Sequence, residues 1–196
     1  MFFFAATRRG HRANAEVAGA GEFSPPGILD AMSDPLSALF RRLFEYEQDS
    51  HAKVLAALQA VPEEQRARAE FQKALDLFAH LVAARRIWLG RLGVTPPLQG
   101  GLEPKGAKLS ELAGRLTEMQ ALWSRYLAGL HDADVQRSFE YQSLDAGRFR
   151  NTLEEVLTQL YGHSLYHRGQ IALQLRALGC TPPTTDFIFW ARVALS

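Results

Sequence analysis

Four long segments of this chain repeat apolar side chains at every third or fourth residue, the spacing of one face of an α-helix. They cover residues 35–61, 65–93, 108–130 and 152–178, and proline, glycine or capping residues bound them. No segment of similar length alternates apolar and polar residues convincingly, as a strand would. The pattern therefore predicts an all-α domain, and we expect a four-helix bundle.

Capping residues mark the ends of two of these helices. Asp34 precedes Pro35, so we expect Asp34 to be the N-cap of the first helix, with proline at its first position. Thr152 and Glu155 have the spacing of a capping box that opens the last helix. Gly179 would end that helix.

Two other stretches lack a long helical pattern. Residues 135–141 partly alternate, which predicts a short strand or an extended strap within 131–149. The tail carries Phe187, Phe189 and Trp190, which must pack on the bundle or against another subunit. We expect a homodimer for this reason, and a single-chain mass in solution would contradict it.

Residues 1–33 differ from the rest of the chain. A short apolar start is followed by three early arginines and a stretch rich in glycine and alanine. We expect a disordered extension, followed by the bundle domain at 34–196. An alternative is that Met32 is the true start and the preceding residues are not native.

Composition narrows the classes of function. The 196 residues suffice for one domain with a sizeable core, and 47% apolar with 22% charged content is typical of soluble proteins. The net charge of +1 gives no bulk reason to bind nucleic acid or an anionic membrane. The single cysteine, Cys180, fits a reducing compartment, so we expect a cytoplasmic protein.

The last helix contains two histidines four residues apart, His163 and His167. On a helix such residues lie about 5–6 Å apart and can converge on one metal ion. Both fall in the middle of an apolar stripe, where an unpaired ring nitrogen costs about 1–3 kcal/mol. The pair predicts either a metal site or two histidines bonded to carboxylates or carbonyls.

A third histidine would strengthen the metal interpretation. Of the six in the chain, His11 lies in the extension and His131 at the end of the third helix. His80 in the second helix and His51 in the first can both face the core. Spacing alone does not choose between them.

Two stretches carry a resemblance to a known family. In residues 77–92, Trp88 follows His80 by eight positions. Residues 161–171 read Tyr-Gly-His-Ser-Leu-Tyr-His-Arg-Gly-Gln-Ile, and a glycine, two prolines and Asp186 follow. These features resemble the DinB-like (DinB/YfiT-like) family of metal-dependent four-helix-bundle proteins. The resemblance covers about 34–190.

The resemblance implies a bundle with unusual connectivity and a divalent metal held by His80, His163 and His167, with open positions for water or substrate. Three neutral imidazoles suit Zn, Ni or Fe better than Mg or Ca. Relatives commonly have an asparagine-containing segment where this chain has 48–51. His51 could therefore contact a metal ligand without binding the metal, be a ligand itself, or be an exposed polar residue.

Several neighbours have open roles. A ligating imidazole donates its other N–H to an acceptor, for which Glu47 is a candidate; alternatively Glu47 is a solvated surface carboxylate. Arg168 could bind a substrate carboxylate, or Arg168 and Gly169 could let helices approach while the guanidinium forms a salt bridge. Tyr166 and Gln170 fit packing or hydrogen-bonding roles.

A metal with an open position can activate a bound water or thiol. Some members of the wider family are thiol-dependent transferases, so we expect a metal-dependent thiol transferase or hydrolase acting on a small molecule, with a low-molecular-weight thiol as a candidate partner. Glu47 and Asp186 are the only candidate general bases, and no catalytic residue is assigned. The alternative is a stress-related, non-catalytic module that binds metal or a small ligand.

Overall fold

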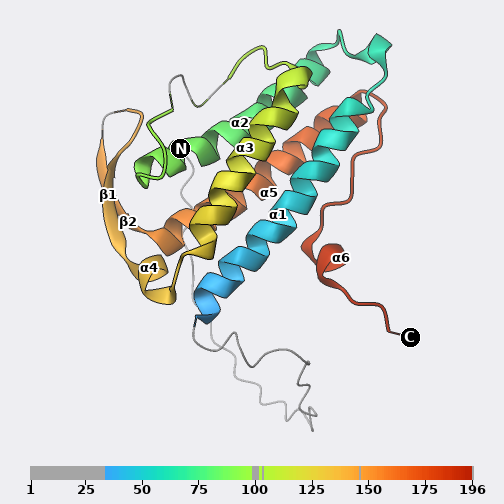
Figure 1. Cartoon of the computed structure of the whole chain (residues 1–196). Coiled ribbons are helices and arrows are strands. Elements are labelled where there is room, and N and C mark those ends of the chain that lie inside the picture. Colours follow the sequence, from blue (N-terminus) through green and yellow to red (C-terminus); the bar gives the residue numbers. More distant parts are fainter. Residues whose placement is uncertain (1–33, 99–101, 103, 146, 196) are drawn as a thin grey trace, which may run out of the picture. The chain divides into compact units, whose positions relative to one another are not determined.

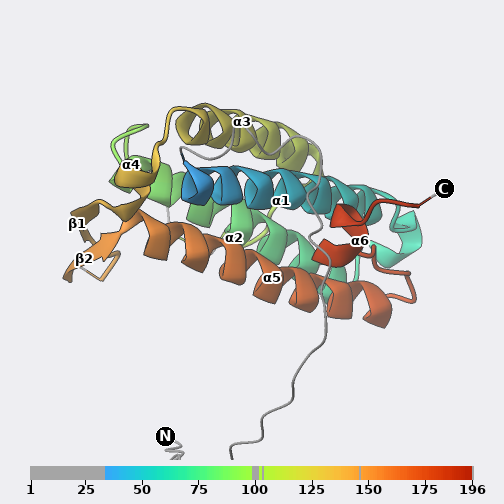
Figure 2. The same ribbon diagram turned by 90° about the horizontal axis from the view of Figure 1, so that it is seen from below.

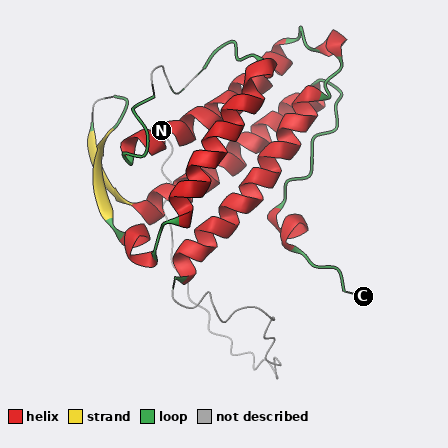
Figure 3. Ribbon diagram, in the orientation of Figure 1, coloured by secondary structure: helices red, strands yellow, loops and turns green. Residues whose placement is uncertain are grey.

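A computed structural model describes residues 34–98, 102, 104–145 and 147–195. Its long helices are α1 (Pro35–Gln59), α2 (Ala69–Arg91), α3 (Leu109–Ala128) and α5 (Leu153–Ala177). The short elements are a 3-10 turn (Glu63–Gln65), α4 (Asp132–Gln136), β1 (Ser138–Gln142), β2 (Arg148–Thr152) and α6 (Phe187–Ala191). Figures 1 and 3 show that helices dominate, which confirms the predicted all-α class. The predicted extension and its Met32 alternative lie outside the described residues.

The four long helices form a bundle in which sequence neighbours are not all spatial neighbours. α5 packs against α2 and α1, and α3 packs against the same two helices from the other side. The order around the bundle is therefore α1, α3, α2, α5, and Figure 2 shows α3 and α5 on opposite sides. α1 and α2, although consecutive, lie across the diagonal. This order is an unusual connectivity for a bundle, as the resemblance implied.

The first two helices are shorter than their apolar pattern predicted. α1 ends at Gln59 instead of 61, and α2 begins at Ala69 instead of 65. Arg66 explains the break, because its guanidinium donates to the carbonyls of Gln59 (2.9 Å) and Val61 (3.0 Å). These bonds hold the chain in the 3-10 turn between the helices.

The last helix begins as predicted. The Thr152 hydroxyl accepts a hydrogen bond from the Glu155 amide at 3.2 Å, and the Glu155 carboxylate accepts one from the Thr152 amide at 2.8 Å. The capping box is therefore confirmed. At the far end Gly179 has a positive φ of 77°, which the end of the helix requires.

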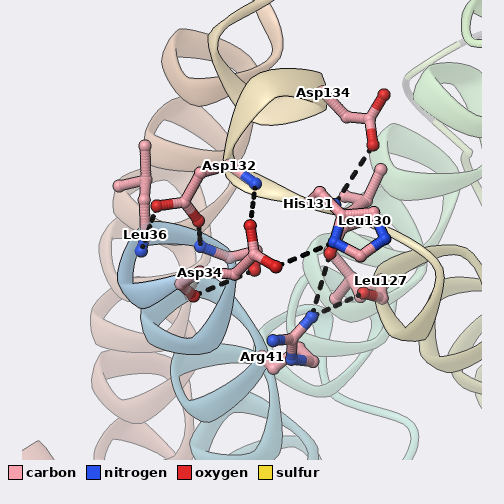
Figure 4. Close-up of polar contacts among 9 residues, drawn as sticks. Asp34, Leu36, Arg41, Leu127, Leu130, His131, Asp132 and Asp134 are labelled. Atoms are coloured by element: carbon pink, nitrogen blue, oxygen red, sulfur yellow. Dashed lines mark hydrogen bonds and ion pairs between the residues drawn. The ribbon is translucent and has the colours of Figure 1, made fainter. Parts of the chain in front are cut away.

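Asp34 stands at the N-cap position of α1 as predicted, but its side chain does not cap that helix. The Asp34 carboxylate accepts hydrogen bonds from the Asp132 amide and from His131 Nδ1, both at 2.8 Å. The Asp132 carboxylate in turn accepts from the amides of Leu36 (3.2 Å) and Ser37 (2.8 Å). Figure 4 shows this exchange: each carboxylate caps the other helix, which ties the start of α1 to α4.

The segment between α3 and α5 contains a β-hairpin. β1 confirms the predicted strand, and it pairs with the antiparallel β2, which the sequence analysis missed. Phe139 and Tyr141 of β1 lie with their ring centroids 6.4 Å and 4.9 Å from that of Trp88. Because Trp88 belongs to α2, these aromatic contacts attach the hairpin to the end of that helix.

The tail packs back on the bundle as one of the two predicted outcomes. The rings of Phe187 and Trp190 lie 5.1 Å and 5.7 Å from that of Tyr46 in α1. Ile188 and Phe189 are 64% and 51% exposed. Two of the three tail side chains behind the homodimer prediction thus have partners within the chain, and the homodimer stays a prediction.

Among the described helices, none combines the length and apolar character that a membrane span needs. The cytoplasmic location stays a prediction.

Replacing Asp132 with alanine should lower the free energy of unfolding by about 1 kcal/mol, within the range of about 0.5–2 kcal/mol known for N-caps. The cause is the loss of both bonds to the start of α1. Urea unfolding measures the change. Glu118→Ala is the control, because Glu118 is 64% exposed and its one ion pair among the described residues is a surface contact with Arg86.

Asp34→Ala tests whether the two caps stabilise the fold as one coupled unit. Because each carboxylate holds the other's helix start, the effects of Asp34→Ala and Asp132→Ala should not add in the double variant. Strictly additive losses would contradict the reciprocal arrangement.

Candidate metal centre

Three histidines meet between α2 and α5. His80 comes from α2, and His163 and His167 come from successive turns of α5. One ring nitrogen of each lies within 4.8 Å of the others. His163 Nε2 is 3.0 Å from Nε2 of both His80 and His167. The structure thus brings together the three residues that the resemblance implied.

The spacing of these nitrogens suits a metal ion. Zinc lies about 2.0–2.1 Å from each imidazole nitrogen, which places tetrahedral ligand atoms roughly 3.3 Å apart. The observed separations of 3.0 Å are close to that value. The three histidines therefore form a group that could hold a metal ion after a small adjustment.

Hydrogen bonds on the outer side of two rings orient them toward the cluster. Nδ1 of His80 lies 2.8 Å from the carbonyl oxygen of Leu102, and Nδ1 of His167 lies 2.7 Å from Oε1 of Gln170. Both partners are acceptors, so each Nδ1 carries the proton and donates it. The lone pair of each Nε2 then points inward, as a metal ligand requires.

Burial also keeps the α5 histidines neutral. It lowers the pKa of His163 to about 4, and the neighbouring His167 and His80 act in the same direction. Burial likewise lowers the pKa of His167, against a raising effect of Gln170. At neutral pH both rings are in the form that binds metal.

The histidines lie at the edge of the buried face of α5, not in its middle as predicted. The buried positions are Leu160, Ser164, Arg168 and Ile171, whereas His163 and His167 are only partly buried. The apolar pattern was misleading because a serine and an arginine occupy the interior seam. The edge position leaves the cluster partly open to solvent.

Both interpretations of Glu47 are wrong. Glu47 is 1% exposed, so it is no surface carboxylate. It pairs with the buried Arg85, whose Nε donates to Oε1 at 3.1 Å while Nη2 donates to Oε2. The acceptors of the histidine cluster are Leu102 and Gln170 instead.

His51 is an interior residue that lies beside the buried Glu47. It is 1% exposed, which excludes the exposed interpretation, and among the described residues it is not part of the metal-competent group. Its Nε2 shares a 3.0 Å hydrogen bond with Ser164 Oγ and lies 3.6 Å from Glu47 Oε1. Because Ser164 follows His163 directly, His51 supports the cluster only through the helix that carries it.

The interpretations of Arg168 and Gly169 need correction. Arg168 is buried, donates from Nη2 to the Tyr46 hydroxyl at 2.7 Å, and lies 5.0 Å above the Tyr46 ring. Within the described ranges it forms no salt bridge, and at 4% exposure it offers no surface to a substrate. Gly169 is exposed, and a Cβ added there would meet no described atom within 4 Å, so it does not serve a close helix approach.

The remaining candidates divide clearly. Gln170 has the predicted hydrogen-bonding role, and Tyr166 packs with its ring 5.0 Å from that of His167. The carbonyl of Leu102 was missed, because a backbone oxygen in a loop has no sequence signature. Neither candidate base, Glu47 or Asp186, belongs to the described metal-competent group; Asp186 lies at the start of α6.

His51 should make stability depend on pH. Burial lowers the pKa of His51 well below 6.5, and the positive charges of Arg85 and Arg168 add to this effect. The unfolded chain takes up the proton first, so stability is full above pH ~6.5 and falls below it by up to about 1.4 kcal/mol per pH unit. Urea unfolding of metal-free protein should therefore show a shallower loss between pH 7.5 and 5.5 in His51→Gln.

His131→Gln is the matched control. Asp34 raises the pKa of the exposed His131 through its hydrogen bond, so this histidine stabilises the fold at low pH and its removal should steepen the loss. An unchanged pH profile in His51→Gln would contradict the role of the buried ring.

Comparison with known proteins agrees with this geometry. The sequence matches the DinB family over residues 32–194. Protein DinB of Bacillus subtilis (strain 168) is 24% identical over 157 residues, which cover 74% of this chain and 90% of that protein. No solved structure matches the chain. Because the family match spans all four long helices and all three clustered histidines, the chain belongs to the DinB family.

Proposed function

We propose that this protein is a metal-dependent enzyme, which binds one divalent transition metal through His80, His163 and His167. The reaction is the activation of a water or a low-molecular-weight thiol toward a small-molecule substrate, as in a hydrolase or a thiol transferase. The observation that carries the proposal is the convergence of three Nε2 atoms, with the outer protons of His80 and His167 held by acceptors.

The donor set indicates the class of metal. Three neutral imidazoles favour Zn, Ni or Fe, whereas Mg and Ca prefer oxygen ligands. No carboxylate joins the three histidines in the part of the chain that the structure describes. Three protein ligands leave a position for water or substrate, which is the arrangement of catalytic zinc sites.

The bound metal would supply a lowered pKa for water or thiol at that open position. The protein's own contribution is to hold the ligand rings and to shape the adjoining space. His163 forms part of the wall of a cavity of about 160 Å³, together with apolar residues such as Ile87 and Leu160. A substrate in this cavity would lie beside the cluster.

A second candidate is the stress-related, non-catalytic module that binds metal or a small ligand. One observation favours it: within the described residues no carboxylate stands in the cluster to act as a general base. Glu47, the only buried candidate, is already paired with Arg85.

Alanine at His80, His163 or His167 should each lower metal affinity by more than about 100-fold, because losing an outer partner alone costs 10–100-fold. Elemental analysis of zinc-loaded, dialysed protein measures this, and the unaltered chain should hold close to one ion. The His131→Ala variant should keep its metal, because His131 bonds to Asp34 and is not one of the clustered histidines. Full metal content in any of the three variants would contradict the assignment.

Metal-loaded protein should accelerate thiol transfer to electrophilic acceptors or hydrolysis of activated esters, and chelation should abolish the activity. Gln170→Leu removes the acceptor of the His167 Nδ1 proton, so it should lower activity or metal affinity by about 10–100-fold. A metal-bound protein that stays inert toward several thiols and esters would favour the non-catalytic module.

A further inference from the structure

The cavity beside His163 extends along α2 toward the hairpin. Its volume of about 160 Å³ lies between the apolar side chains of Ile87 and Leu160 and reaches Arg91. A second hollow of about 340 Å³ shares Ile87, Arg91 and Leu144 with the first. The two spaces therefore adjoin at Arg91 and form one path that leads from the histidine cluster to the hairpin.

Arg91 differs from the other arginines of α2. Its guanidinium lies 4.6 Å from the centre of the Trp88 ring and 5.0 Å from that of Tyr141. Arg85 pairs with Glu47 and Arg86 pairs with Glu118. Arg91, by contrast, has neither an ion pair nor a side-chain hydrogen bond to any residue that the structure describes.

The positive charge of Arg91 has no anionic partner among the described residues. Arg91 is partly buried, and this burial lowers its pKa below the ordinary value of an arginine. The rings of Trp88 and Tyr141 attract the guanidinium through their π electrons, an interaction that does not use up its N–H donors. Such a planar donor set matches a carboxylate through two parallel hydrogen bonds.

Apolar side chains make up most of the rest of the wall, which also contains Gln159, Gln142 and Ser143. Leu144, which lines both hollows, is 62% exposed and offers further apolar surface to a ligand. His80 lies eleven positions before Arg91 on α2, a rise of roughly 16 Å at about 1.5 Å per residue. His163, which faces His80, and Arg91 both line the first cavity, so a molecule that contacts both must be elongated, with a mostly apolar middle.

We propose that this path binds an elongated, mainly apolar molecule with one carboxylate, placed so that the carboxylate pairs with Arg91 and the other end approaches His163. The inference names the substrate class of the proposed function and rests on that function for the reaction. Binding itself needs only Arg91 and the apolar walls, and so it can be tested without the metal.

Octanoate and octan-1-ol are suitable probes, because they share a chain and differ in the carboxylate. Calorimetric titration of the full chain should show that octanoate binds more tightly than octan-1-ol, both to the zinc-loaded and to the chelator-treated protein. Arg91→Gln should weaken octanoate binding by about 10- to 100-fold and leave octanol binding unchanged, since a charged hydrogen bond contributes that much. Arg91→Lys keeps the charge but loses the two parallel hydrogen bonds, so its affinity for octanoate should lie between those of the unaltered chain and of Arg91→Gln.

Arg86→Gln is the control, because it removes the same charge from the same helix at a residue paired with Glu118. Equal losses in Arg86→Gln and Arg91→Gln would overturn the inference, and so would the failure of octanoate to bind at millimolar concentration. If octanoate binds only the zinc-loaded protein, and Arg91→Gln does not change its affinity, then its carboxylate binds the metal. In that case the proposed function stands and this inference fails. Arg91-dependent binding in a chain that takes up no metal would have the opposite meaning: the carboxylate site stands and the proposed function fails.

Discussion

The ion pair between Glu47 and Arg85 joins α1 and α2 across the diagonal of the bundle. Both side chains are buried, and the Arg85 guanidinium lies 5.4 Å from the ring centres of Phe44 and Trp123. The Arg85 carbonyl also accepts a 3.2 Å hydrogen bond from Trp123 Nε1 in α3. Losing one partner of a buried pair typically costs about 3–5 kcal/mol. This contact therefore links α1, α2 and α3 at one level of the bundle, and breaking it is costly.

The same layer fixes the rotation of α5. Ser164 bonds to His51, and Arg168 bonds to Tyr46, so both α5 residues face inward toward α1. Each of them directly follows a histidine of the cluster. Successive residues turn by about 100° around a helix, which places His163 and His167 at the edge beside α2. The histidine cluster thus depends on an interior that contains serine and arginine where an apolar seam would be usual.

Sequence periodicity was enough to predict the four long helices, because their apolar faces recur over many turns. The residues of the cluster were predictable only with the family resemblance, since His51 and His80 have equally suitable spacing in their helices. The structure explains the ambiguity: both rings do turn inward, but His51 faces Ser164 and His80 faces His163.

Other features depend on contacts between distant segments, which a local pattern does not contain. Asp34 has the local sequence of an N-cap, yet its carboxylate bonds to Asp132, 98 residues away. The second strand of the hairpin has the sequence Arg-Phe-Arg-Asn-Thr, which is too short and too polar for its pattern to predict a strand without the pairing with β1. The Leu102 carbonyl acts on His80 from a loop between helices.

The local charge around the cluster differs from the balanced charge of the whole chain. The net charge of +1 suggests no preference for charged partners. Yet the described walls of the two adjoining hollows contain Arg91 and no carboxylate, and a metal held by three neutral histidines would keep its full positive charge there. In a partly dry cavity such charges act more strongly than in water. An anionic ligand, whether a thiolate at the metal or a carboxylate at Arg91, is therefore the chemistry that this path favours.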